Sequence, residues 1–259
     1  MSEISEQLPS LLKLAVDVAL EAATLLSGRP TNFEINQKSS AVDFATQMDH
    51  ASEALIVERL LAARPLDGII GEEGAQRDSQ SGITWVTDPL DGTVNYFYGL
   101  PGWNVSIAAK NDEGVLVGVV AAPTINSLWT ATVGGGAFWN GNPITCNDPV
   151  RLDRALLATG FSYSLAKRVG QAEFAKKLIP DVRDIRRAGA AAVDLCHVAM
   201  GAVDGYFEID LKEWDLAAGG LIAREAGAIV SGRNGGAAGE EMVIAAGPAL
   251  HRELTARIG

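Results

Sequence analysis

Residues 84–93 read Thr-Trp-Val-Thr-Asp-Pro-Leu-Asp-Gly-Thr, and this stretch joins a strand-like apolar run to two carboxylates. Asp88 directly follows residues 85–87, which have the pattern of a short β-strand, and Asp91 stands three residues later. Pro89 lies between the two acids and restricts the turn, so both side chains can converge on one point. Because ligand sites of mixed sheets tend to lie at the ends of strands, this stretch predicts a carboxylate site at the end of a strand.

Two other acidic elements have a similar placement. A Gly-Glu-Glu run at 71–73 follows a short apolar run, and a Trp-Asp pair at 214–215 precedes a helical pattern. Taken singly, each has an ordinary structural explanation. Asp215 and Asp49 would serve as N-caps of helices, and Glu72 would lie in a solvated loop.

Together, the three acidic elements point to a bound cation. Two carboxylates about 4 Å apart repel each other by roughly 4 kcal/mol at an effective dielectric constant of about 20. A cluster of such groups therefore persists only with a compensating positive charge. Ligand sets made only of oxygen favour magnesium, manganese or calcium over zinc.

The pattern of apolar residues divides the chain into two halves, residues 1–149 and 150–259. The first half begins with helical stretches at 8–26 and 49–63, joined by an extended segment at 33–46. It continues as an antiparallel meander, with strand-like runs at 85–87, 104–109, 115–121, 128–133 and 137–139. In the second half, strands at 156–159, 185, 206–209, 229 and 243–245 alternate with helices at 166–178, 190–200, 216–225 and 248–258. This arrangement predicts an α+β half beside an α/β half.

The composition is that of an ordinary globular protein. Of the 259 residues, 47% are hydrophobic and 20% are charged, which argues against disorder. The net charge is -11 and no basic patch stands out, which argues against sequence-independent binding to nucleic acid. Lys13 and Asp17 interrupt the first apolar stretch, so it predicts a core helix rather than a signal peptide. Cys146 and Cys196 have no CxxC spacing, and the chain is predicted to be cytoplasmic with no membrane partner.

Other catalytic designs fit poorly. The three histidines, His50, His197 and His251, have neither nucleophile-elbow nor zinc-protease spacing. His197 lies in an apolar helical run and is predicted to be a core residue. The glycine run at 134–136 precedes a strand-like segment, so it lacks the helix start that a dinucleotide or P-loop site requires. The arginine pair at 186–187 is predicted to be a solvated turn.

These motifs, in this order, resemble the inositol monophosphatase family. The combination of Asp-Pro-Leu-Asp-Gly-Thr at 88–93 with Trp-Asp-Leu-Ala-Ala-Gly at 214–219 is strongly specific. Supporting segments run through nearly the whole chain: 38–43 with Asp49, 71–73, Asn95, Gly99, Pro101, the glycine-rich hairpin at 134–141 and the small-residue helix start at 189–192. The resemblance implies the layered αβαβα sandwich of this family, which agrees with the two halves described above.

The resemblance also implies two or three magnesium ions in each active site. Glu72, Asp88 and the Leu90 carbonyl would hold one ion. Asp88, Asp91 and Asp215 would hold a second, and Glu72 would also reach a third, weaker one. Residues 38–49 have few large apolar side chains and are predicted to become ordered when magnesium binds.

The resemblance also implies which residues contact the substrate and the attacking water. Thr93 and Glu72 would orient and deprotonate the attacking water, with Asp49 bonded to the Thr93 hydroxyl. The backbone N–H groups at the start of the helix after Gly92 would receive the phosphate. The residues expected to face the substrate are Asp91, Gly92, Thr93, Ala191, Glu208 and Asp215.

The activity implied is hydrolysis of a small phosphate monoester by two-metal activation of water. The Val-Asn-Tyr that follows the 88–93 motif is nearer to the inositol type, which makes inositol monophosphate the first choice of substrate. Histidinol phosphate is the second choice, with fructose 1,6-bisphosphate and 3′-phosphoadenosine 5′-phosphate as further alternatives. Val94, Ala190 and Glu213 depart from the usual family pattern and leave the exact substrate open.

A function of another class is a non-catalytic regulatory binding protein on the same fold. The intact acidic set argues against lost activity, although it leaves room for a second role. The resemblance further implies a homodimer.

Overall fold

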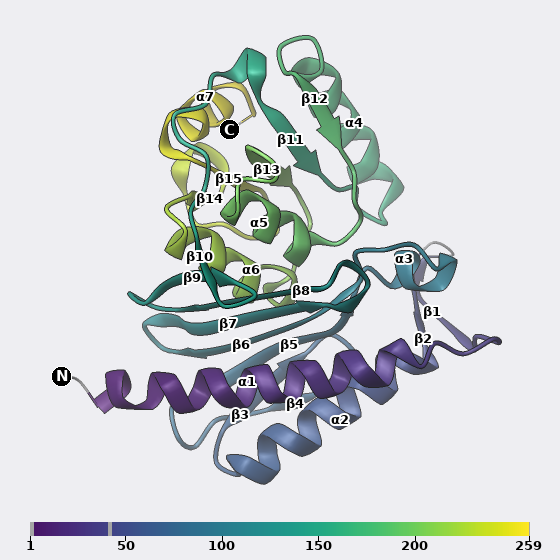
Figure 1. Cartoon of the computed structure of the whole chain (residues 1–259). Helices are drawn as coiled ribbons and strands as arrows, with labels where there is room; N and C mark the ends of the chain where they lie inside the picture. Colours follow the sequence, from purple (N-terminus) through teal and green to yellow (C-terminus); the bar gives the residue numbers. More distant parts are fainter. Residues whose placement is uncertain (1–2, 41–42, 259) are drawn as a thin grey trace.

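The computed structural model describes residues 3–40 and 43–258. These residues form five layers: two helices, an eight-stranded sheet, two helices, a five-stranded sheet and two outer helices (Figure 1). The αβαβα sandwich predicted from the resemblance is therefore confirmed. Within the described ranges, no helix combines the length and the apolar character needed to cross a membrane.

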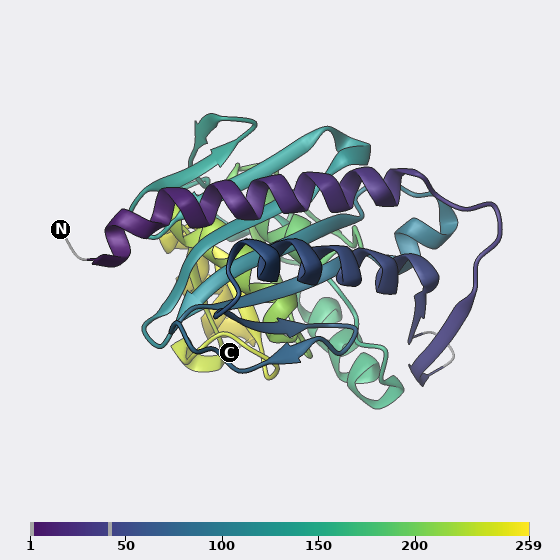
Figure 2. The ribbon, with the colours of Figure 1, turned by 90° about the horizontal axis from the view of Figure 1, so that it is seen from below.

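The first layer consists of α1 (Glu3–Ser27) and α2 (Gln47–Ala63), which lie side by side across one face of the large sheet (Figure 2). The stripe that α1 buries repeats every three or four residues, as an amphipathic helix requires. It includes Leu11, Ala15, Val18, Ala22 and Leu26. Both helices lie at the predicted places.

The start of α2 differs from the prediction. Thr46 is the N-cap, and its hydroxyl accepts a hydrogen bond from the Met48 N–H at 3.1 Å. Asp49, predicted to be the cap itself, lies three residues later, and its carboxylate accepts from the Thr46 N–H at 2.7 Å. This reciprocal capping box explains why an acid belongs at that position without being the cap.

Before α2 the chain forms a small two-stranded sheet. β1 (Ile35–Ser40) pairs antiparallel with β2 (Asp43–Thr46), as expected for the segment predicted to be extended. The motif predicted at 38–43 includes residues 41–42, which lie outside the described residues.

The eight-stranded sheet has the order β10-β9-β8-β7-β6-β5-β3-β4. Its strands are β3 (Gly68–Gly71), β4 (Gln76–Arg77), β5 (Thr84–Asp91), β6 (Asn104–Asn111), β7 (Gly114–Ala122), β8 (Ser127–Thr132), β9 (Gly136–Trp139) and β10 (Asn142–Ile144). From β5 to β10 each strand pairs antiparallel with the next, which confirms the predicted meander. β3 pairs parallel with β5. Between Asp88 and Asp91 the ladder with β6 shifts register, and this irregularity lies where the two carboxylates are needed.

The five-stranded sheet has the order β12-β11-β13-β15-β14. Its strands are β11 (Leu156–Thr159), β12 (Asp184–Arg186), β13 (Gly205–Glu208), β14 (Ile229–Ser231) and β15 (Val243–Ala246). β11 pairs parallel with β12 and β13, whereas β15 pairs antiparallel with β13 and β14. The outer helices are α4 (Leu165–Leu178) and α7 (Pro248–Ile258) (Figure 1). Short helical segments are α3 (Thr93–Tyr98) and the 3-10 turns η1 (Pro123–Ile125), η2 (Leu152–Arg154) and η3 (Arg233–Gly235).

The middle layer consists of α5 (Ala191–Ala199) and α6 (Glu213–Glu225), which contact both sheets. Every residue of α5 except His197 is buried. The close approach of α6 requires glycine at position 118 of β7, because a Cβ there would lie 2.8 Å from the Ala218 carbonyl oxygen. The boundary predicted at 149/150 falls between β10 and η2, and a division into two folding units there stays a prediction.

Candidate active site

A pocket opens where the ends of β3, β5 and β13 meet the starts of α5 and α6. Its lining includes nine of the ten residues predicted for the site: Glu72, Asp88, Leu90, Asp91, Gly92, Thr93, Ala191, Glu208 and Asp215. Asp49, the tenth, does not line the pocket but is hydrogen-bonded to Thr93. Residues from both halves of the chain thus converge, while their roles stay predictions.

Four carboxylates of this pocket disfavour each other's charge. Burial raises the pKa of Asp88 well above its usual value, and its three acidic neighbours in the pocket raise it further. Burial also raises the pKa of Asp215, with added repulsion from Glu72 and Asp91. Burying charges of one sign together is costly until a cation compensates them.

Backbone and amide groups hold these side chains in place. The Asp88 carboxylate accepts from the Leu90 N–H at 3.0 Å, closing the turn around Pro89. Asp91 Oδ2 accepts from the Asn104 side-chain amide and from the Ala192 N–H, both at 2.9 Å. Asp91 is therefore fixed jointly by β6 and by the start of α5.

Asp215 lies in the first turn of α6, where Lys212 is the N-cap. Its carboxylate accepts from the Lys212 N–H at 2.7 Å. The ordinary structural explanation of Asp215, that it caps this helix, does not hold, because α6 begins three residues earlier than its apolar pattern does. An acid in this first turn is favoured by the helix dipole and also faces the pocket.

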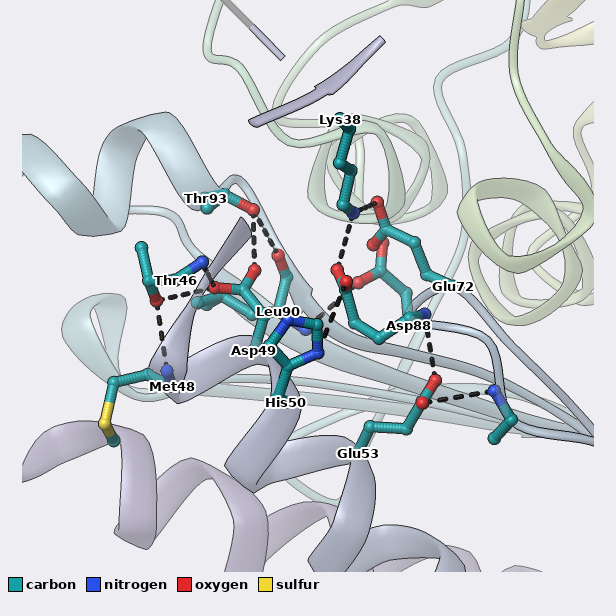
Figure 3. Close-up of polar contacts among 12 residues, drawn as sticks. Lys38, Thr46, Met48, Asp49, His50, Glu53, Glu72, Asp88, Leu90 and Thr93 are labelled. Carbon is teal, nitrogen blue, oxygen red and sulfur yellow. Dashed lines mark hydrogen bonds and ion pairs between the residues drawn. The ribbon is translucent and has the colours of Figure 1, made fainter. Parts of the chain in front are cut away.

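Lys38 of β1 supplies a positive charge to the acidic cluster (Figure 3). Its ammonium group lies 2.9 Å from Glu72 Oε1 and 2.5 Å from Glu73 Oε1. Burial opposes the charge of Lys38, but the Glu72 carboxylate and the hydrogen bonds to Glu73 and Glu72 outweigh burial and raise the pKa of Lys38. Lys38 thus neutralises one edge of the cluster.

The donor set fits a hard divalent cation. Its groups are carboxylates whose charged forms are disfavoured by burial and by one another, and hard cations such as magnesium prefer oxygen ligands. As they stand, no three Asp, Glu, His or Cys side chains in the described part of the chain form a group tight enough to hold one ion.

Thr93 is the first residue of α3, next to the carboxylates, and its hydroxyl is buried (Figure 3). The hydroxyl lies 3.0 Å from Asp49 Oδ1 and 3.2 Å from the Leu90 carbonyl, to either of which it can donate. Asp49 is held in turn by the N–H and hydroxyl of Thr46. Gly92 has φ 85°, and a Cβ there would lie 3.3 Å from Ala190 Cβ, so this turn requires glycine.

Glu53 was not singled out by the sequence, yet it supports the loop that carries Glu72 (Figure 3). Its carboxylate accepts from the N–H groups of Glu73 at 2.9 Å and Ala75 at 3.2 Å. Gly71 makes this possible, since a Cβ there would lie 2.2 Å from Glu53 Oε1. Glu53 stands at helical spacing from Ile56 and Leu60, and an acid on that apolar stripe was the signal that could have identified it.

The pocket lining also contains Glu208, at the end of β13. Tyr206 donates to Glu208 Oε2 at 2.5 Å. Burial raises the pKa of Glu208 from 4.5 to about 7, against the effects of the Tyr206 hydrogen bond and of the Arg187 charge. Gly160 leaves room for this carboxyl group, because a Cβ at that position would lie 2.0 Å from it.

The arginine pair at 186–187 is solvated as predicted, since both side chains are exposed. Arg186 pairs with Asp184 and ends β12 rather than lying in a turn. Arg187 also lines the pocket near Glu208, which the sequence analysis did not predict. Gly189 next to it has φ 97°, and a Cβ there would lie 2.5 Å from the Arg187 guanidinium. Asp194 of α5 also lines the pocket and was missed.

His197 is only partly buried, but its ring packs edge-on against Trp129, with centroids 5.9 Å apart, so the prediction of a core residue holds in part. The prediction for the glycine run is confirmed. The glycine run at 134–136 forms a strand connection, not a helix start. The N–H groups of Gly134 and Gly136 donate to the Glu225 carboxylate at 2.9 Å each, which ties this hairpin to α6.

Comparison with known proteins agrees with these features. The model of the inositol monophosphatase family matches residues 7–258. The inositol-1-monophosphatase of Mycobacterium leprae is 41% identical over 86% of this chain and 81% of its own. Nus factor SuhB of Escherichia coli K12 is 42% identical over 87% and 86%. The crystal structure of the extragenic suppressor protein suhB from Bartonella henselae has a TM-score of 0.91 at 33% identity and covers 96% of this chain and 98% of that one. The chain therefore belongs to the inositol monophosphatase family.

Proposed function

We propose that this protein is a magnesium-dependent phosphatase of small phosphate monoesters. The observation that carries the proposal is the convergence of Glu72, Asp88, Asp91 and Asp215 on one pocket beside the hydrogen-bonded pair Thr93–Asp49. The raised pKa values of these acids are what a cation would relieve.

Two or three magnesium ions would be held by Glu72, Asp88, the Leu90 carbonyl, Asp91 and Asp215. When bound, they would neutralise the phosphate and make a nearby water more acidic. The N–H groups of Gly92 and Thr93, at the start of α3, would receive phosphate oxygens.

Proton transfer is assigned to Thr93 and Glu72. Because the Thr93 hydroxyl can donate to Asp49, its oxygen stays free to accept a hydrogen bond from water and orient it. Glu72 would accept the water's proton: burial raises its pKa, the charge of Lys38 opposes this, and a base with a pKa closer to neutrality is more effective. Asp49 positions Thr93 without itself reaching the pocket.

Inositol monophosphate is the proposed substrate, and histidinol phosphate is the alternative to test beside it. The name of the Mycobacterium leprae relative, inositol-1-monophosphatase, supports this order. Glu208, Asp91 and the Ala191 backbone would face the substrate hydroxyls. The homodimer and the cytoplasmic location stay predictions.

A phosphate-release assay tests the function. Release from inositol 1-phosphate should require magnesium, stop with excess EDTA and be inhibited by lithium. Full activity in excess EDTA would refute the proposal. A panel with histidinol phosphate, fructose 1,6-bisphosphate and 3′-phosphoadenosine 5′-phosphate would then rank the substrates.

A regulatory role is the second candidate, because the Escherichia coli relative is named Nus factor SuhB. A regulatory role is compatible with phosphatase activity, because the chain retains all of the acids proposed to hold magnesium. An Asp88→Asn variant separates them: hydrolysis should be lost, while a regulatory function independent of catalysis should persist.

A further inference from the structure

Asp194 is a buried acid of the pocket for which the fold offers no partner. It lies in the first turn of α5 and lines the pocket with Glu208 and Arg187, yet only 2% of its surface is exposed. Among the described residues, none forms a hydrogen bond or an ion pair with its carboxyl group.

The other buried carboxylates of the described chain differ in this respect. Each accepts at least one hydrogen bond from a backbone or side-chain donor. These residues are Asp49, Glu53, Asp67, Asp88 and Asp91. The carboxyl oxygens of Asp194 are not among the fully enclosed unpaired atoms of the described residues, so they open onto the pocket, where a ligand donor can reach them.

The charges that act on Asp194 show which part of the pocket it faces. Burial raises its pKa well above the usual value, Glu208 and Asp91 raise it further, and Arg187 opposes them. Glu72, Asp88 and Asp215 are not among these charges, although they dominate the acidic cluster. Asp194 therefore lies beside Glu208 and Arg187, and among the proposed metal ligands only Asp91 acts on its charge.

We propose that Asp194 is a specificity-determining residue, whose carboxyl group accepts a hydrogen bond from a substrate hydroxyl remote from the phosphate. The inference rests on the proposed phosphatase function. Glu208 binds Tyr206 through one oxygen, which leaves its other oxygen as a second acceptor beside Asp194. Two neighbouring acceptors match two neighbouring hydroxyls of a polyol.

Arg187 favours a hydroxyl over an ammonium group as the donor. Its positive charge already acts on both Glu208 and Asp194. A second cation at the same place would be repelled by the guanidinium, whereas a neutral hydroxyl would not.

The test compares two substrates with the same ring, inositol 1-phosphate and cyclohexyl phosphate, which lacks hydroxyls. Asp194→Ala should raise KM for inositol 1-phosphate about tenfold or more and leave kcat/KM for cyclohexyl phosphate within about threefold. Asp194→Asn keeps one acceptor oxygen and should lie between wild type and Asp194→Ala. Asp112→Asn, in the exposed turn after β6, is the matched control and should change neither substrate.

Equal losses on both substrates would show that Asp194 acts through the fold and would overturn the inference. A loss confined to histidinol phosphate would show an ammonium or imidazole partner and would overturn it as well. Calorimetric binding of inositol 1-phosphate in magnesium with inhibitory lithium, which should stop turnover, decides the question separately from hydrolysis. If the wild type binds but does not hydrolyse, the phosphatase proposal fails, while weaker binding by Asp194→Ala would still support this one.

Discussion

Replacing Glu208 by glutamine should stabilise the metal-free protein near neutral pH and above, and change little in acid. Burial raises the pKa of this carboxyl from 4.5 to about 7 in the folded protein. Between these two values the folded state keeps a proton that the unfolded state has lost, so stability falls as pH rises. The penalty is absent below about pH 4.5 and complete above about pH 7.

The size of the effect follows from the same values. The pKa differs by about 2.5 between the states, the difference of 7 and 4.5, and each pH unit is worth about 1.4 kcal/mol. Ionised Glu208 therefore costs the fold about 3 kcal/mol, an order-of-magnitude figure. Glutamine has the same shape and can still accept the hydrogen bond from Tyr206, so the substitution removes mainly the charge.

Urea denaturation with EDTA, at about pH 4 and about pH 8, measures this difference. Glu208→Gln should gain about 3 kcal/mol in the free energy of unfolding at the higher pH and close to nothing at the lower. Glu173→Gln, on the exposed surface of α4, is the control and should show no such pH dependence. The same change in stability at both pH values would refute the argument from burial.

The catalytic consequence of Glu208→Gln should be selective. KM for a polyol phosphate should rise, corresponding to a loss of about 1–3 kcal/mol in binding free energy. The effect on p-nitrophenyl phosphate should be smaller, and the magnesium requirement should be unchanged. Equal effects on both substrates would mean that Glu208 acts on the metals or on the fold.

Three other substitutions test the acidic cluster and its support. Asp91→Asn should lower activity by orders of magnitude yet leave the metal-free protein at least as stable, since burial raises the pKa of Asp91; denaturation in EDTA checks this. Gly71→Ala would place a Cβ 2.2 Å from Glu53 Oε1 and should cost about 1–3 kcal/mol of stability together with activity. Gly170→Ala, in open space on α4, is its control and should not destabilise. Lys38→Met should tighten magnesium binding in calorimetry, because the Lys38 ammonium group pairs with the Glu72 carboxylate and competes with the ion for it. Weaker binding would show that Lys38 instead supports the ion.

The sequence predicted the order of helices and strands well, because in most elements the apolar residues recur at a clear helical or strand spacing. The stripe of α1 and the alternating runs of β5 to β9 are long enough to show it. β4 and β10, with two and three residues, are too short for any period and were missed. Helix starts were misplaced for a related reason. The apolar pattern of α6 begins after Asp215, whereas its first turn is polar and begins at Glu213.

The lining residues that belong to a motif were predictable, whereas Arg187 and Asp194 were not. Glu72 and Asp88 stand beside strand patterns that fix where they lie. Arg187 is solvated as predicted, but nothing local shows that it also lines the pocket. Asp194 appeared only as a charge in an apolar helix, and its lack of a partner depends on packing between the two sheets.

Under the proposed function, chemistry and recognition would come from different stretches of the chain. The residues proposed for water activation lie mostly between positions 49 and 93, while Arg187, Asp194 and Glu208 come from a later stretch. The two sets meet at Asp91, whose carboxylate accepts from the Ala192 N–H of α5. Substitutions confined to positions 187–208 would then change which alcohol is accepted and leave the residues proposed for hydrolysis unchanged. One scaffold would in this way serve different phosphate esters by changing one wall of its pocket.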